Sequence, residues 1–358
     1  MVSWTDLGGH ELEPALRCGS VRLVDARFIV ELSDRGQLFE RRQNVPDSAF
    51  LSLEQLQQGE HLNDCLRIIS VSHPWLTPDH PDPRGENLRL LAATLRAVLR
   101  KWGGPWGVFI DFMSLHQKVR TAEEQGLFAE GLRTLSCWYS HPRLTVVKIT
   151  KLPRDYPTGL HFPAGSTPNT ADYYERGWCY CESSVSNLVK PTMYVWDLGQ
   201  LNELPTEDQY DLIVKQCALT ANRPPPLLPS DFAEALATKA FTSKKADLET
   251  VSRLYQAAFG QRLGAARVLN FKALGWGDSE VVTLAGVLSS GATPKLNELH
   301  LSLNPAVGDK GMQAIAAAIR SGNLPGLSQL SMGSNRATEE GQQAVTDACD
   351  EHWVTVQL

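Results

Sequence analysis

A single carboxylate, Glu182, falls within an otherwise apolar stripe of a predicted helix. Trp178, Cys181 and Val185 recur at the i, i+3, i+7 spacing of a helix face that packs against a core. A carboxylate on such a face is costly unless a cation, hydrogen-bond donors or a ligand compensates it. Two interpretations follow. Glu182 either forms a structural ion pair, for instance with Arg176, or it is an active-site carboxylate at the mouth of a cleft.

The elements around Glu182 follow the pattern of an α/β fold. Short, nearly continuous apolar runs are typical of strands buried on both faces, and they occur at 66–71, 107–111, 144–149 and 191–196. Helical patterns alternate with them, at 86–102, 121–138, around Glu182 and at 206–219. This alternation predicts an open parallel sheet with helices on both faces. A β-branched run at 21–32 predicts a further strand.

Polar residues collect in the segments that follow the predicted strands. In open parallel sheets, ligands bind outside the carboxyl ends of the strands. Three segments fall at that edge, namely 72–85, 111–117 and the long loop 151–171 that leads to Glu182. A loop as long as 151–171 inside a compact domain is more often functional than incidental. The convergence of these segments favours the active-site interpretation of Glu182.

Three of these segments carry a distinctive combination of residues. They read Ile-Ser-Val-Ser-His-Pro-Trp at 69–75, Phe-Ile-Asp-Phe-Met-Ser-Leu-His-Gln at 109–117 and Arg-Gly-Trp-Cys-Tyr-Cys-Glu at 176–182. In this order they resemble the signature segments of heterokaryon-incompatibility (HET) domains. The pattern Trp-Cys-x-x-Glu182 is also similar to that of plant-type TIR domains. The resemblance covers about residues 66–200 and implies a flavodoxin-like, TIR-like α/β domain in an immunity or cell-death protein.

The resemblance implies an activity as well as a fold. In TIR enzymes of this kind the matched glutamate, here Glu182, is the catalytic residue of NAD cleavage. A fixed carboxylate can stabilise the positive charge that develops on the ribose as its bond to nicotinamide breaks. By placement, we expect the substrate to be bound by Ser72, His73, Trp75, Arg84, Asp111, Gln117, Arg176 and Trp178. Trp75 would stack on a base or on nicotinamide, and Arg84 or Arg176 would neutralise the diphosphate.

Several of these placements have a purely structural alternative. Trp75 could fill the end of the sheet, and Asp111 could cap the helix that follows it. Arg176 could pair with a neighbouring carboxylate, and His73 could bind a loop carbonyl.

The last hundred residues repeat. The pattern Leu296-x-x-Leu299-x-Leu301-x-x-Asn304 returns at 327–335, and a less regular copy lies at 266–271. This resembles ribonuclease-inhibitor-type leucine-rich repeats, with one strand and one helix per unit. Together the patterns divide the chain into an N-terminal extension (1–60), a TIR/HET-like domain (61–221), a Pro-rich linker with a helical cap (222–262) and the repeats (263–358).

Composition and spacing exclude several classes of protein. The net charge of −6, without a dense basic run, argues against a nucleic-acid-binding protein. No apolar run is long enough to span a bilayer, the start of the chain lacks the features of a secretion signal, and the seven cysteines have no framework spacing. We therefore expect a cytoplasmic protein without membrane contact. Neither the metal-ligand spacings nor a glycine-rich phosphate loop is found, so we expect no metal and no cofactor other than NAD as substrate.

Two functions of different kinds remain open. In the first, the protein is an enzyme that cleaves NAD or a related nucleotide and is regulated by its repeats or by self-association. In the second, it is a non-catalytic signalling or scaffold protein, in which the α/β domain associates with like domains and the repeats bind a protein partner.

Overall fold

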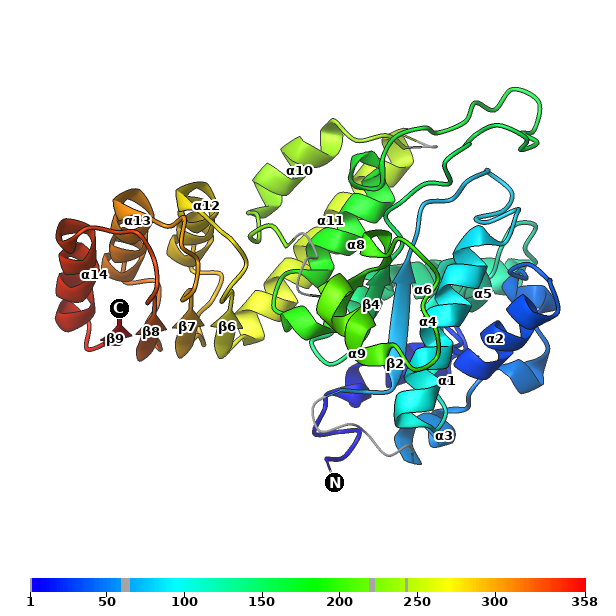
Figure 1. Ribbon diagram of the computed structural model, residues 1–358, viewed down its shortest axis with the longest axis horizontal. Helices are drawn as coiled ribbons and strands as arrows, with labels where there is room; N and C mark the ends of the chain where they lie inside the picture. The colour runs from blue at the N-terminus through cyan, green and yellow to red at the C-terminus, as the bar shows by residue number, and fades with distance from the viewer. Residues whose placement is uncertain (1, 59–64, 219–222, 242–243) are drawn as a thin grey trace. The chain divides into compact units, whose positions relative to one another are not determined.

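The computed structural model describes residues 2–58, 65–218, 223–241 and 244–358. The chain divides into two compact units (Figure 1). The first unit comprises residues 1–186, 192–222 and 238–254, and the second comprises residues 187–191, 223–237 and 255–358. This division differs from the predicted one, because residues 1–60 and 238–254 belong to the same unit as the central α/β domain.

The first unit is built on a five-stranded sheet of order β1-β3-β2-β4-β5. Its strands are β1 (Val24–Asp25), β2 (Ile68–Ser72), β3 (Gly107–Ile110), β4 (Thr145–Lys148) and β5 (Val195–Asp197). β1 runs antiparallel to β3, whereas the pairs β3–β2, β2–β4 and β4–β5 are parallel. A mixed α/β fold with a mostly parallel sheet is therefore confirmed.

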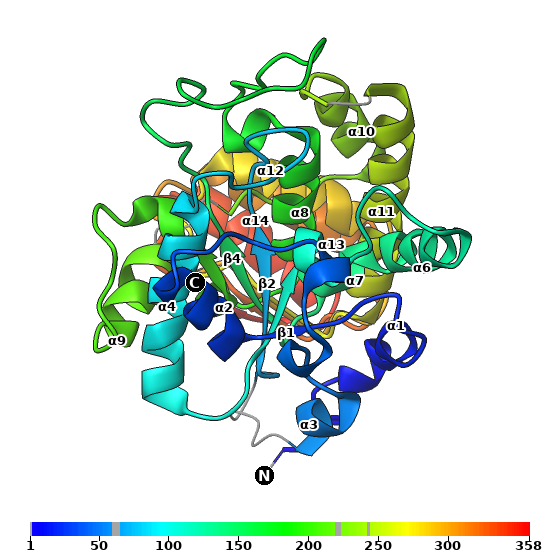
Figure 2. The same cartoon turned by 90° about the vertical axis from the view of Figure 1, so that its right-hand side faces the viewer.

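Helices cover both faces of this sheet (Figure 2). They connect successive parallel strands and are α4 (Glu86–Trp102), α5 (Asp111–Ser114), α6 (Ala122–Arg133), α7 (Leu135–Ser140) and α8 (Gly177–Ser186). α4 packs with α2 (Ala26–Asp34) and α9 (Tyr210–Ile213) on one face, while α7 packs with α8 on the other. Shorter helices, α1 (Glu13–Arg17) and α3 (Leu53–Gln58), belong to the N-terminal part.

Alternation along β2 separates an apolar face from a polar one. Ile69 and Val71 belong to the core cluster that includes apolar residues of α4. Ser70 and Ser72 point to the opposite face, where Ser70 Oγ donates a 2.7 Å hydrogen bond to the carbonyl of Trp138 in α7. The fully buried Ser72 thus ends β2 on the face that α7 and α8 cover.

The strand predicted over 21–32 is wrong for most of its length. Only Val24–Asp25 is a strand, and Ala26 begins helix α2. The Asp25 side chain accepts a hydrogen bond from the backbone N–H of Arg27 and caps the helix. Ala26, Ile29 and Leu32 are buried at helical spacing, so burial of one face overrides the β propensity of the run.

The helix predicted over 206–219 is shorter and irregular. It consists of α9, Tyr210–Ile213, followed by a π-helical turn, Val214–Ala218. Residue 219 lies outside the described residues. The helices predicted within 230–262 are present as α10 (Pro229–Ala237) and α11 (Lys244–Ala265).

The second unit alternates strand and helix. Its parallel four-stranded sheet follows chain order, β6 (Val268–Asn270), β7 (Glu298–His300), β8 (Gln329–Ser331) and β9 (Thr355–Gln357). The intervening helices are α12 (Asp278–Ser289), α13 (Asp309–Arg320) and α14 (Glu339–Glu351). The three strand positions predicted from the repeats are confirmed, whereas β9 was not predicted. The backbone repeats as well, since Ala273, Leu303 and Ser334 all have φ between 57° and 60°.

A buried asparagine explains why the repeat pattern contains this residue. Asn304 is fully buried, and its side-chain oxygen accepts from the N–H groups of Leu274 (3.0 Å) and Trp276 (3.1 Å). Its amide nitrogen donates to the carbonyls of Phe271 (2.9 Å) and Leu301 (2.8 Å). One side chain therefore satisfies backbone groups of two successive units, as buried polar groups require.

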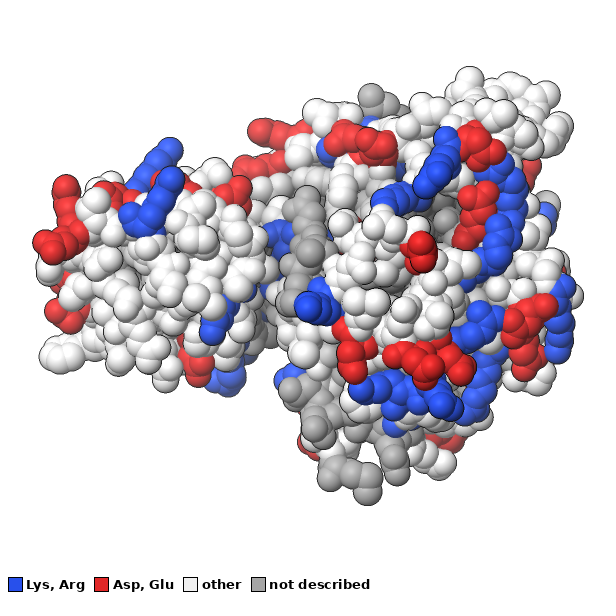
Figure 3. Space-filling model, in the orientation of Figure 1, with Lys and Arg blue, Asp and Glu red and all other residues white. Residues whose placement is uncertain are grey.

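Basic and acidic side chains are intermixed over the first unit on the face shown in Figure 3. Cations of α4 are paired, Arg96 with Asp34 and Lys101 with Asp211 (2.9 Å). Among the helices of the described residues, none has the length and apolarity needed to cross a membrane.

Candidate functional site

The helix that carries Glu182 is fixed at its first residue. The N–H of Gly177 donates to the carbonyl of Ala240 (2.9 Å), and the N–H of Ala240 donates to the carbonyl of Glu175 (2.8 Å). The Phe241 ring packs against Gly177 so closely that a Cβ there would lie 1.9 Å from the ring. Residues 240 and 241, predicted to cap the repeats, instead hold the start of α8.

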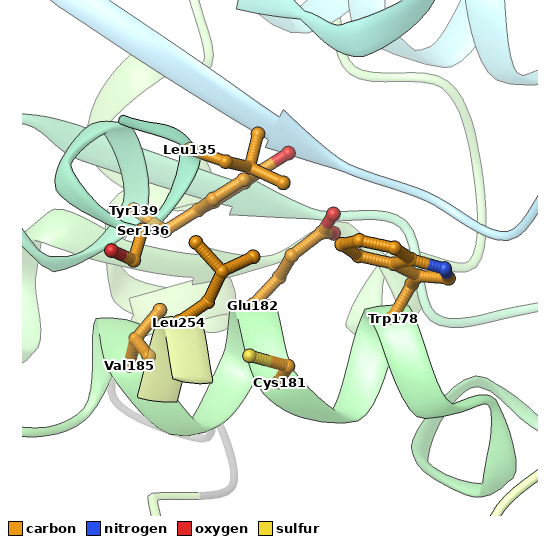
Figure 4. A pocket seen from close by; sticks show the side chains of 8 residues that line it. All are labelled: Leu135, Ser136, Tyr139, Trp178, Cys181, Glu182, Val185 and Leu254. Atoms are coloured by element: carbon orange, nitrogen blue, oxygen red, sulfur yellow. The ribbon is translucent and has the colours of Figure 1, made fainter. Parts of the chain in front are cut away.

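Glu182 reaches from α8 to the end of β2. Its side chain is partly buried, and its Oε2 accepts a 2.5 Å hydrogen bond from Ser72 Oγ. The hydroxyl of Tyr173 lies 2.5 Å from the same Ser72 oxygen. Figure 4 shows the Glu182 side chain leaving the helix beside the Trp178 ring. The structure therefore places Glu182 at the carboxyl edge of the sheet, as the sequence predicts.

The surroundings of Glu182 favour its neutral form. Burial raises the pKa of Glu182 and the nearby charge of Asp111 adds to the rise, while hydrogen bonds from Ser72 and Tyr139 oppose it, and the resulting pKa is about 8. Among the described residues, no lysine or arginine forms an ion pair with Glu182. The ion-pair interpretation with Arg176 is therefore wrong, and hydrogen-bond donors compensate the carboxylate instead.

Arg176 binds backbone carbonyls rather than carboxylates. Its Nη1 donates to the carbonyl of Trp75 (2.6 Å), its Nε to that of Ala171 (2.9 Å), and its Nη2 to that of Asn169. Only 5% of Arg176 is exposed. This side chain ties the loop 151–171 to the loop after β2, so its guanidinium is occupied by backbone carbonyls and the predicted contact of Arg176 with a diphosphate is wrong.

Asp111 lies at the centre of a second polar group. Its Oδ2 accepts from the indole N–H of Trp75 (2.9 Å), and its Oδ1 accepts from the N–H of Phe112 (2.7 Å) at the start of α5. His73 Nε2 lies 3.5 Å from Oδ1. His73 is buried, and neither of its ring nitrogens has a hydrogen-bond partner among the described residues. The Trp75 indole is thus held against Asp111 and, edge to face, against the Phe112 ring.

Gln117 and Arg84 are engaged by protein groups. The Gln117 amide donates to the carbonyls of Asp111 (3.0 Å) and Leu115 (2.8 Å), so it closes its own loop. Arg84 forms two hydrogen bonds with Asp155, of 2.8 and 2.7 Å, and an ion pair with Glu86 of 2.9 Å. Arg84 therefore links the loop after β2 to the loop 151–171, which is a structural role.

A small pocket borders Glu182 (Figure 4). Its lining comes from α7, α8 and α11 and consists of Leu135, Ser136, Tyr139, Trp178, Cys181, Glu182, Val185 and Leu254. Its free volume is about 10 Å³, which is about the space that one water molecule needs. This pocket is far too small to hold a nucleotide.

Two groups near the site were not predicted from the sequence. Tyr139 is buried in α7 and donates to the carbonyl of Val71 (3.1 Å), and its pKa is raised by burial. Lys148 ends β4 in register with Ser72, is fully buried, and donates to the hydroxyl of Tyr174 (3.2 Å). Burial lowers the pKa of Lys148 to about 8. A lysine inside an apolar run was the available signal for Lys148, whereas no pattern distinguished Tyr139.

The described residues contain no group of three or more His, Cys, Asp or Glu side chains placed to hold a metal ion. Cys179 and Cys181 are both buried, and the Cys181 thiol donates to the carbonyl of Val251 (3.8 Å). Comparison with models of known protein families and with curated proteins finds no match for this chain. A functional assignment must therefore be argued from the site.

Proposed function

We propose that the first unit is a flavodoxin-like, TIR/HET-like domain that cleaves the nicotinamide–ribose bond of NAD or a related nucleotide with Glu182. The strand order supports this fold. If the parallel strands are counted from β2, the order β3-β2-β4-β5 reads 2-1-3-4, which is the order of the first four strands of flavodoxin-like sheets. The observation that carries the activity is the position of Glu182. A partly buried carboxylate meets the carboxyl end of a central parallel strand, where such folds bind ligands.

The chemistry needs little more than a placed carboxylate. As the bond between C1′ and the pyridinium nitrogen breaks, its electron pair neutralises the nicotinamide, and positive charge develops on the ribose. Ionised Glu182 stabilises that charge, and water then adds to C1′ and loses a proton. No general acid is required, because neutral nicotinamide is a good leaving group. Asp111, near enough to raise the pKa of Glu182, adds a second negative charge to the same region.

The substrate-binding residues retained from the sequence are those that lie beside Glu182 or Asp111. Ser72 and Trp178 border Glu182, while His73 and Trp75 border Asp111. Because the pocket holds about one water, a nucleotide bound in it would require the lining side chains to move apart. The indole of Trp75 is a candidate to stack on a base.

Nicotinamide release tests the proposal directly. The purified full chain is incubated with NAD, at concentrations that include those at which it self-associates, and free nicotinamide is measured. We expect Glu182→Gln to lower the rate by about 100-fold or more, as loss of an electrostatic stabiliser does. Glu203→Gln, which changes an exposed glutamate of the same unit, is the matched control. Equal background release from the native chain and from Glu182→Gln would refute the proposal.

The alternative is a non-catalytic signalling or scaffold protein, and the small pocket favours it. In this case the first unit associates with like domains. The second unit, which we propose is a leucine-rich-repeat solenoid, binds a protein partner through the outer side of its sheet. Most residues on that side are polar and at least partly exposed, among them Asn270, His300, Gln329 and Gln357, and the exposed Val268 adds an apolar side chain. Light scattering of the chain at increasing concentration tests the association. In either case we expect the protein to act in the cytoplasm.

A further inference from the structure

A chain of hydrogen bonds ends on the Glu182 carboxylate. Ser72 Oγ donates to Glu182 Oε2 over 2.5 Å, and the hydroxyl of Tyr173 lies 2.5 Å from Ser72 Oγ. A serine hydroxyl has one proton to give, so when Ser72 donates to ionised Glu182 it accepts from Tyr173. Burial holds the pKa of Tyr173 well above its ordinary value, so the phenol keeps the proton that it donates.

The surrounding residues hold this chain of hydrogen bonds in a single geometry. Ser72 is fully buried in β2, where its backbone is in register with β4. Tyr173 is 1% exposed and begins the 3-10 turn that leads into α8, with its ring edge to face against Tyr174. Within the part of the chain that the structure describes, the Tyr173 hydroxyl forms its hydrogen bond with Ser72. The ring of Tyr173 therefore packs as a phenylalanine ring would, and its hydroxyl contributes to the chain of hydrogen bonds through Ser72.

We propose that Tyr173 is a positioning residue of the Glu182 site, which acts through Ser72 to orient the carboxylate and to stabilise its ionised form. The effect on catalysis rests on the proposed function, whereas the effect on the carboxylate does not. Donors aimed at a carboxylate favour its ionised form, and a donor that is itself hydrogen-bonded is the stronger one.

Other titratable groups around Glu182 are accounted for. They are Asp111 from α5, Tyr139 from α7, and Cys179 and Cys181 from α8 itself. Burial raises the pKa of Tyr139 and of both thiols, so these three groups stay neutral while Glu182 titrates. The negative charge of Asp111 opposes ionisation of Glu182 and a hydrogen bond from Tyr139 favours it, and neither residue is changed in the variants compared below.

The carboxyl group itself can be titrated without turnover. Infrared difference spectra of the full chain across pH 5–10, with Glu182→Gln subtracted, give the midpoint at which Glu182 ionises. Because Ser72 donates directly to the ionised carboxylate, we expect Ser72→Ala to raise this midpoint by about one pH unit, which corresponds to about 1.4 kcal/mol. Tyr173→Phe, which keeps the ring, should raise it by a few tenths of a pH unit. Tyr174→Phe removes a neighbouring hydroxyl that bonds to Lys148 instead, and should leave the midpoint unchanged.

A double variant separates positioning from packing. If Tyr173 acts through Ser72, then Tyr173→Phe should shift the midpoint in the native chain but not in the Ser72→Ala background. An unchanged midpoint in Tyr173→Phe overturns the proposal, and so does an equal shift in both backgrounds. If Tyr173→Phe fails to fold, Ser72→Ala still tests whether this chain of hydrogen bonds stabilises the ionised form of Glu182.

The same proteins distinguish this proposal from the proposed activity. With NAD, we expect the pH at which nicotinamide release reaches half its maximum to move with the infrared midpoint. If no protein releases nicotinamide while the midpoints shift as described, NAD cleavage is refuted and the positioning role of Tyr173 stands. If release occurs and the midpoints do not move, the positioning role is refuted and the activity stands.

Discussion

Replacing Glu182 by glutamine should stabilise the first unit, and more so as the pH rises. In the unfolded chain a glutamate ionises near pH 4.5, whereas burial raises the pKa of Glu182 in the folded protein to about 8. Between these values the folded protein holds a proton that the unfolded chain has lost. The contribution of Glu182 to the free energy of unfolding therefore falls as the pH rises from about 4.5 to about 8, and is constant above that.

The size of the effect follows from the two pKa values. One pKa unit corresponds to about 1.4 kcal/mol, so the interval from 4.5 to about 8 corresponds to an upper bound of roughly 5 kcal/mol. Glutamine carries no proton to lose, and it fills nearly the same space beside Ser72. The gain of Glu182→Gln over the native chain should be near zero at pH 4 and reach at least about 2 kcal/mol at pH 9.

Urea unfolding measures this gain. Native chain and Glu182→Gln are unfolded at pH 5, 7 and 9, and the transition that the substitution shifts is followed by tryptophan fluorescence. Other titrating groups are present in both proteins, so their contributions cancel in the difference between the two free energies of unfolding. Glu203→Gln, at an exposed position of the same unit, should show no trend with pH. A gain of Glu182→Gln that is the same at all three pH values would refute the argument that Glu182 is kept neutral by burial.

Three further substitutions test other parts of the structure. Asn304→Ala should cost about 2–4 kcal/mol, because it leaves buried backbone groups of two repeat units without partners, and urea unfolding of the second unit measures it. Gly177→Ala should destabilise the first unit by about 1–3 kcal/mol despite the helix preference of alanine, because the new Cβ overlaps the Phe241 ring. Thermal unfolding measures this loss, and adding Phe241→Leu should restore part of it. Arg176→Lys should speed hydrogen exchange and proteolysis within 151–171, because an ammonium cannot bond three separate carbonyls in the fork geometry of arginine.

The parallel sheet could be predicted because its strands are buried on both faces. Such strands are continuous apolar runs, and the run that becomes β2 ends one residue before the polar residue that meets Glu182. The start of the helix at Thr121 likewise depends on neighbours in the sequence, because Thr121 and Glu124 form a capping box in which both hydrogen bonds are present. The strand predicted over 21–32 was wrong because the same β-branched residues fit either the period of a strand or that of a helix, and only the position of the core decides between the two.

The position of Glu182 could be predicted, but the partners of the surrounding cations could not. Arg84 and Arg176 were expected to face a ligand because both lie in loops at the carboxyl edge of the sheet. In the structure Arg84 pairs with Asp155, 71 residues away along the chain, and Arg176 bonds to backbone carbonyls. Backbone carbonyls carry no sequence signal, and a contact between two loops depends on how each loop folds. The sequence therefore predicts the position of Glu182 better than it predicts the partners of the charged side chains around it.

The ionisation of Glu182 bears on which substrates the proposed reaction can use. With a pKa of about 8, only about one tenth of the carboxyl groups are ionised at pH 7. A neutral nucleoside would meet a mostly protonated Glu182 and would also need its leaving group protonated. The pyridinium ring of NAD brings a positive charge into the same low-dielectric region, which lowers the pKa of a nearby carboxyl group. A cationic N-glycoside would thus both carry its own good leaving group and ionise the residue that stabilises its transition state. Burial of Glu182, which opposes catalysis in the free protein, would then favour cationic substrates over neutral ones.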